Sequence, residues 1–81
     1  MAVVHDEIAG FISKKSKVPT RELSSTTKIY KSGLISSLSM LDLLCHLENT
    51  FAITIRPEEL IEDNFEDIGT LASFIENKMK A

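Results

Sequence analysis

Residues 33–51, GLISSLSMLDLLCHLENTF, decide the fold of this 81-residue chain. Apolar side chains recur at helical spacing along this stretch, which predicts a helix over residues 37–50 after a loop that turns at Gly33. Ser36 is the expected N-cap of that helix. Ser37 then lies in the first turn, where backbone N–H groups have no partner within the helix and can meet an anionic group. A serine in this position is suited to covalent modification.

A helical wheel of this segment, drawn at ~100° per residue, separates two apolar stripes. The first is the expected core face, and it consists of Met40, Leu43, Leu44, Leu47 and Phe51. The second stripe lies outside that sector and consists of Leu38, Leu41 and Cys45, with Asp42 and Glu48 at its flanks. A small apolar strip rimmed by acids is typical of a surface for transient partners. The alternative is that the second stripe is not a partner surface. In that case the domain wraps this helix more completely, and Leu41 packs under the long loop.

The first half of the chain predicts one more helix and a long loop. Residues 3–15 carry apolar side chains at helical spacing, with acids early and lysines late, as the helix dipole favours. Val18-Pro19 should end this helix. Residues 16–36 form a long loop, which we expect four apolar side chains to anchor: Leu23, Ile29, Tyr30 and Leu34.

The second half predicts an extended connection and two further helices. Residues 51–55 alternate like a strand, but a lone short strand has no partner, so we expect a connection that buries Phe51 and two isoleucines. Pro57 suits the first position of a short helix. Asp63 or Asn64 is expected to cap a further turn at residues 65–66, and the final helix is expected to be capped by its own threonine, Thr70.

The fold class that follows is all-α. Residues 1–81 are expected to form a single domain, a small four-helix bundle of three longer helices and a short third helix, with a long first loop. Net charge is only −3 and 43% of residues are hydrophobic, which argues against a disordered chain. A lone cysteine allows no internal disulfide and favours a reducing compartment. With no secretory signal and no apolar run of transmembrane length, we expect a cytoplasmic monomer without membrane insertion.

The residue pattern argues against catalysis, metal binding and nucleic-acid binding. His46 falls on the polar side of its helix and should be solvated, while Cys45 lacks zinc-ligand spacing and an activating base. Met40 and Met79 fit a core. Ser37 has no recognisable histidine and aspartate partners of the kind found in a Ser-His-Asp catalytic triad. Eight acids face one arginine between residues 42 and 67, which repels nucleic acid and favours basic protein surfaces.

Taken together, these residues resemble an acyl carrier protein over nearly the whole chain. Carrier domains place an Asp-Ser-Leu triplet after a glycine-containing loop, then the same periodic helix, then a phenylalanine and a short apolar connection. The matching parts here are GLISSL at 33–38, LDLL at 41–44, LE at 47–48 and FAITI at 51–55. The segments PEEL and DNF, from residue 57 on, resemble the third-helix region of D-alanyl, peptidyl and stand-alone biosynthetic carriers rather than the central fatty-acid carrier.

The resemblance implies that Ser37 is the attachment point for 4′-phosphopantetheine, which a phosphopantetheinyl transferase takes from coenzyme A. The arm would hold acyl or aminoacyl groups as thioesters in a specialised lipid, polyketide or peptide pathway. Loading ligases and synthase or transferase enzymes with basic docking surfaces would be the partners. The residues that match partner-contact positions are Leu38, Leu41, Asp42, Cys45, Glu48 and Ile55.

One position departs from the family pattern. Ser36 stands where carriers usually have aspartate. Serine can still cap the helix, but the missing carboxylate removes a charge commonly used in partner contact. Two alternatives therefore stay open. One is a carrier-like interaction module that keeps the fold and is never loaded, and the other is a helical adaptor that docks through the second stripe.

Overall fold

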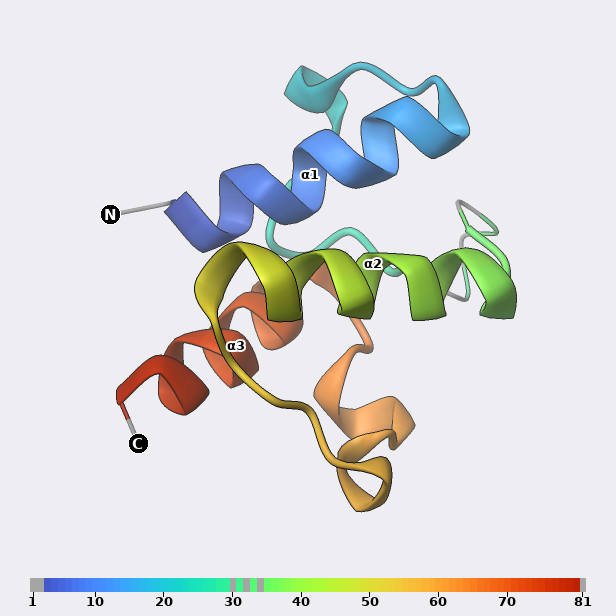
Figure 1. Cartoon of the computed structure of the whole chain (residues 1–81). Coiled ribbons are helices and arrows are strands. Elements are labelled where there is room, and N and C mark those ends of the chain that lie inside the picture. The colour runs from blue at the N-terminus through green and yellow to red at the C-terminus, as the bar shows by residue number, and fades with distance from the viewer. Residues whose placement is uncertain (1–2, 30, 32, 34, 81) are drawn as a thin grey trace.

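The computed structural model describes residues 3–29, 31, 33 and 35–80. Three α-helices make up most of it (Figure 1): α1 (Val3–Ser16), α2 (Ser37–Phe51) and α3 (Ile68–Lys80). The predicted all-α fold is confirmed, and the part of the chain described contains no strand, only an isolated antiparallel bridge between Lys28 and Asp67. Both α1 and α2 agree with their predicted ranges to within one residue.

Three short 3-10 turns join the helices: η1 (Thr20–Glu22), η2 (Pro57–Glu59) and η3 (Glu62–Asn64). The expected short third helix thus exists as two successive turns, with Pro57 at its predicted first position. The Glu59 carbonyl, at the end of the first turn, accepts from the Asn64 side chain (2.7 Å) at the end of the second. The expected turn at residues 65–66, capped by Asp63 or Asn64, is wrong, since the turn is η3 itself.

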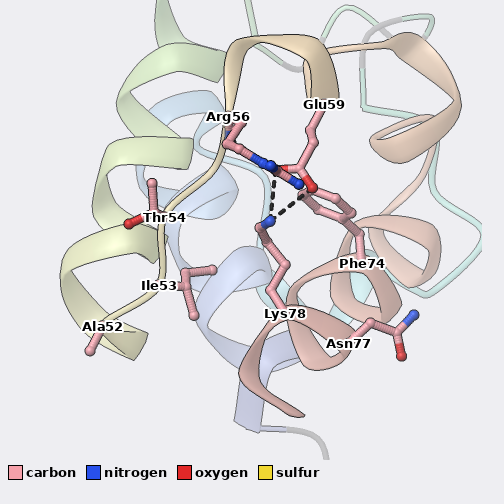
Figure 2. Close-up of a pocket in the computed structure, with 8 residues that line it drawn as sticks. All are labelled: Ala52, Ile53, Thr54, Arg56, Glu59, Phe74, Asn77 and Lys78. Atoms are coloured by element: carbon pink, nitrogen blue, oxygen red, sulfur yellow. Dashed lines mark hydrogen bonds and ion pairs between the residues drawn. The ribbon is translucent and has the colours of Figure 1, made fainter. Parts of the chain in front are cut away.

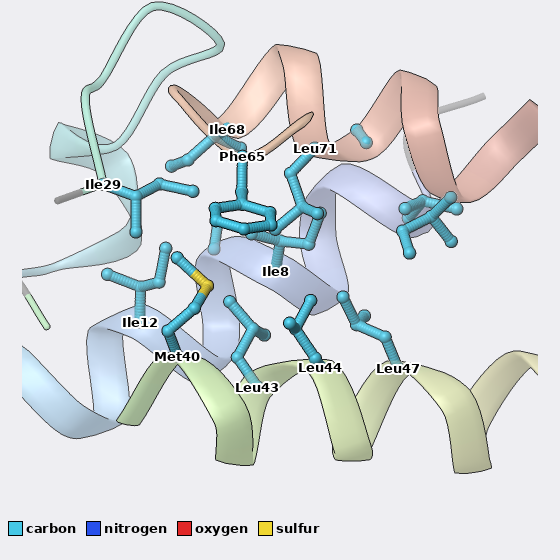
Figure 3. Close-up of a cluster of buried hydrophobic side chains, with 14 of the residues drawn as sticks. Ile8, Ile12, Ile29, Met40, Leu43, Leu44, Leu47, Phe65, Ile68 and Leu71 are labelled. Atoms are coloured by element: carbon cyan, nitrogen blue, oxygen red, sulfur yellow. The ribbon is translucent and has the colours of Figure 1, made fainter. Parts of the chain in front are cut away.

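The core lies where the three helices meet. Helix α1 packs against both α2 and α3, and its C-terminal end lies over the N-terminal half of α2 (Figure 1). Figure 3 shows the α2 face directed at Ile8, Phe65 and Leu71. The predicted core face is confirmed by its buried members, Met40, Leu43, Leu44 and Leu47. Phe51 is half-buried at its margin, together with Ile53 and Ile55 of the extended connection.

Leu23 and Ile29 are buried as predicted, and Ile35 is a further buried anchor that was not predicted. The expected anchors Tyr30 and Leu34 lie outside the described residues. Met79 was expected in the core, and this is wrong: it lies on the last turn of α3 and is 49% exposed.

The start of α3 differs from the prediction. Thr70 was expected to cap it, but the helix begins at Ile68. Asp67 is the cap, because its carbonyl accepts from Leu71 N–H (3.0 Å) and its Oδ1 accepts from Thr70 N–H (2.7 Å). The Thr70 side chain and then the Thr70 amide, both interacting with the ionised carboxylate, lower the pKa of the Asp67 carboxyl.

The long loop is pinned to this helix start by backbone hydrogen bonds. They run from Ile29 N–H to Glu66 O (3.1 Å), from Ile68 N–H to Thr27 O (3.1 Å) and from Gly69 N–H to Ser25 O (2.8 Å). Two of them satisfy amides that have no partner within α3. A Cβ at Gly69 would lie 3.0 Å from Ser25 Cβ and O, so glycine permits this close approach.

Two ion pairs reinforce the packing of the C-terminal half. Lys28 lies 2.9 Å from Glu66, and Lys78 lies 2.7 Å from Glu59 (Figure 2). Each lysine lowers the pKa of its partner carboxyl through a hydrogen bond to the ionised form.

Acid should therefore weaken this fold in a specific way. The folded-state pKa values of Glu59, Glu66 and Asp67 lie below their unfolded values, so their stabilisation is fully present above the unfolded pKa and is lost as pH falls through the folded pKa. Urea unfolding followed by circular dichroism should show the free energy of unfolding falling from about pH 5 downward. Asp67→Asn, which keeps a capping oxygen but cannot ionise, should have a shallower pH dependence, and an unchanged slope would contradict this account.

Candidate functional site

The N-terminus of α2 is built as the sequence predicts. Ser36 has extended backbone angles (φ −85°, ψ 175°), and its Oγ accepts from Ser39 N–H at 3.3 Å. Its carbonyl accepts from Met40 N–H (2.9 Å), which is the first bond of the helix. Ser36 is therefore the N-cap, as expected. Gly33 lies at the turn expected before the helix, and its φ of +76° is a left-handed conformation that glycine adopts without strain.

Ser37 is the first residue of α2. Its side chain lies outside the described part of the structure, so the prediction that its hydroxyl carries the arm stays a prediction. The surrounding turn fits an attached phosphodiester. The Ser39 amide donates to the Ser36 hydroxyl. The amides of Ser37 and Leu38 have no carbonyl partner within the helix. The first turn contains no acid that would repel a phosphate.

The second stripe is exposed. Leu38 is 76% exposed and Leu41 is 50% exposed, and Cys45 also faces solvent. The alternative in which Leu41 packs under the loop is therefore wrong. A run of apolar side chains beside the start of α2 remains uncovered along the described chain, which suits a partner surface.

The two acids that flank the second stripe have different roles. Asp42 is well exposed and lies 3.7 Å from Lys15 Nζ of α1. The Glu48 carboxylate instead accepts from Ile55 N–H at 2.7 Å, and the Glu48 carbonyl accepts from Ile53 N–H. With Ala52 in the left-handed conformation, Glu48 fixes the end of α2 and the start of the connection. Ile55 is half-buried against the core.

His46 was expected to be solvated, and its side chain is 41% exposed, but it also contacts α1 in a way that the sequence did not predict. Its Nε2 lies 2.9 Å from Glu7 Oε1, and its ring packs at 5.5 Å from the Phe11 ring. Glu7 and Phe11 are four residues apart on α1 and thus share a face, which is the one signal that could have suggested this contact. His46 therefore joins α1 to α2 from a half-exposed position.

Sequence reasoning also missed two surface features. Leu60 and Ile61, between η2 and η3, are 41% and 50% exposed. A groove of about 520 Å³ lies between the 52–56 connection and α3 (Figure 2). Its Lys78 and Glu59 neutralise each other across a salt bridge, and it lies at the end of α2 opposite to Ser37.

Other kinds of site find no support in the described residues. They contain no group of three or more histidine, cysteine or acidic side chains that could hold a metal ion. None of the helices described is long and apolar enough to cross a membrane.

Comparisons with known proteins agree with this geometry. A family model described as a phosphopantetheine attachment site matches residues 6–75, which include all of α2. The chain matches no curated protein. It is similar to a chain of a solved structure described as "Crystal structure of FAD-dependent dehydrogenase", with a TM-score of 0.72 and 29% identity. That similarity covers 84% of this chain and 97% of the other.

Members of the matched family bind 4′-phosphopantetheine covalently, and they interact with phosphopantetheinyl transferases and biosynthetic enzymes. Such carrier domains are generally non-catalytic. The match spans most of the chain and coincides with a helical fold of the expected kind. The chain therefore belongs to the acyl-carrier family of phosphopantetheine-binding proteins, and its cofactor is covalently bound 4′-phosphopantetheine.

Proposed function

We propose that this chain holds acyl or aminoacyl intermediates as thioesters on a 4′-phosphopantetheine arm attached to Ser37, and carries them between enzymes of a specialised lipid, polyketide or peptide pathway. The observation that carries this proposal is the family match over residues 6–75, which includes a capped helix start at Ser37. When bound, the arm supplies the thiol that holds the cargo. The amides of Ser37 and Leu38 are the groups of this chain that would face its phosphodiester.

The partner surface in this proposal is the second stripe together with Asp42. Exposed leucines beside the attachment residue give a partner enzyme apolar area to bury, and weak charge attraction speeds encounter without tight binding. A shuttle needs both properties, since it must leave each enzyme after transfer. Glu48 supports this surface indirectly, because its carboxylate holds the end of α2 in place.

The attachment site can be tested by intact mass spectrometry. The unmodified protein is incubated with coenzyme A, magnesium and a broad-specificity phosphopantetheinyl transferase. Wild type should gain one phosphopantetheinyl group, and Ser37→Ala should gain none. Ser39→Ala is the matched control, because it removes another hydroxyl from the same turn and should still be loaded. Loading of Ser37→Ala, or no loading of wild type by several transferases, would contradict the proposal.

The same experiment separates the alternative function. Ser36 in place of the usual aspartate favours a carrier-like module that is never loaded. In that case wild type gains no mass, and Ser37→Ala leaves partner binding and cellular function intact. Loading of wild type at Ser37 rules this alternative out.

The similarity to a chain from a structure described as a FAD-dependent dehydrogenase supports one candidate class of partner. A flavin-dependent dehydrogenase acting on this carrier would take two hydrogens from the tethered acyl group as the flavin is reduced. Mixing the acyl-loaded protein anaerobically with such an enzyme should bleach the flavin absorbance. An enzyme that is bleached equally well by the free acyl-coenzyme A would argue against a carrier-specific partnership.

A further inference from the structure

The edge of the second stripe carries an ion pair between two helices. Lys15 Nζ of α1 lies 3.7 Å from Asp42 Oδ2 of α2, and the two side chains are 43% and 65% exposed. The same ammonium group lies 5.6 Å from the centre of the Phe11 ring. Phe11 packs against the core, so it gives the Lys15 side chain an apolar surface to lie on beside Asp42.

Asp42 is the main anionic group that α2 offers to a partner. The only other acid of α2 is Glu48, whose carboxylate is engaged by Ile55 N–H. The first turn of α2 contains no acid. Lys15 therefore offsets the charge of Asp42, the one of the two acids of this helix whose carboxylate is not bound by a backbone amide.

We propose that Lys15 is a specificity-determining residue of the docking surface, which screens Asp42 and slows association with basic partner enzymes. This inference rests on the proposed function, because it assumes that the second stripe is where partners dock. At distances beyond a few ångströms, the two opposite charges act as a dipole rather than as a free carboxylate, so long-range attraction is weakened. A basic partner must then displace the Lys15 ammonium before it can contact Asp42. The surface therefore favours partners that can displace the Lys15 ammonium over partners that rely on charge attraction alone.

The test compares two neighbouring lysines. Lys15→Met removes the charge but keeps an unbranched apolar side chain over Phe11. Lys14→Met makes the same charge change one residue earlier on α1, where no ion pair with Asp42 exists. The measured quantity is the second-order rate constant for loading by a transferase with a basic docking surface, at low ionic strength. Thermal unfolding of both variants checks that the fold is retained.

We expect Lys15→Met to be loaded about two- to fivefold faster than wild type, and Lys14→Met to gain clearly less. In an Asp42→Asn background, Lys15→Met should gain no more than Lys14→Met does. Salt near 1 M, where screening acts within about 3 Å, should remove the difference. The inference is overturned if Lys15→Met is no faster than Lys14→Met, or if it is slower than wild type.

Failure of this inference can be told apart from failure of the proposed function. Association of the same variants with an immobilised transferase, measured by surface plasmon resonance without coenzyme A, reports docking independently of loading. If wild type associates but is never loaded, the carrier proposal fails, while the order of the association rates still decides the role of Lys15. If no variant associates, the inference fails as well.

Discussion

Leu47→Ala is expected to lower the free energy of unfolding by about 2–5 kcal/mol, through the lost burial of the side chain and the cavity that it leaves. Leu47 is fully buried and points from α2 into the core (Figure 3). A domain of this size has roughly 4–12 kcal/mol of stability in total, so this single change removes a large fraction of it. Urea unfolding followed by circular dichroism at 222 nm measures the difference, since the chain has no tryptophan.

Leu38→Ala is the matched control for that experiment. It makes the same chemical change on the same helix, so any effect of helix propensity is similar. Leu38 is 76% exposed, and its truncation should change the free energy of unfolding by no more than about 0.5 kcal/mol. Equal destabilisation by the two variants would mean that the second stripe is part of the core, and the division of α2 into two faces would be wrong.

The division of α2 could be predicted from the sequence because helical spacing alone determines which side chains share a face. Met40 and Leu47 are buried while Leu38 and Leu41 are exposed, as the wheel indicates. The N-cap at Ser36 was predictable for a similar reason, since capping depends on residues within one turn.

Features that depend on contacts distant in sequence were not predictable. Thr70 and Asp67 are both good capping residues, and the choice of Asp67 follows from the long loop, whose carbonyls bind the amides of Ile68 and Gly69. The residues around the start of α3 do not show where that loop lies in the folded chain. The wheel likewise placed His46 on the polar side of its helix, but it could not show that Glu7 of α1 lies opposite.

The candidate site shows the same limit. Glu48 looked like a free surface acid, yet its carboxylate binds a backbone amide seven residues ahead, in a connection whose path no periodicity defines. The pairing of Lys15 with Asp42 joins residues of two helices, and only their packing brings these charges together. The sequence thus predicted which side chains lie on the second stripe, but it could not predict that Asp42 pairs with a lysine while Glu48 binds the backbone.

Leu38→Asn is expected to slow loading of Ser37 by about 10- to 100-fold, because it removes apolar area that a docked transferase would bury, worth about 1.5–3 kcal/mol. The fold should be unaffected, since this side chain contributes no buried surface to the core. Val3→Asn is the control: Val3 is also exposed (55%) but lies at the start of α1, at the end of the molecule away from Ser37 (Figure 1). Loading rates by mass spectrometry, with unfolding curves for both variants, decide between two readings. A selective loss in Leu38→Asn identifies the second stripe as the docking surface, whereas equal rates in the two variants would show that the transferase recognises another face.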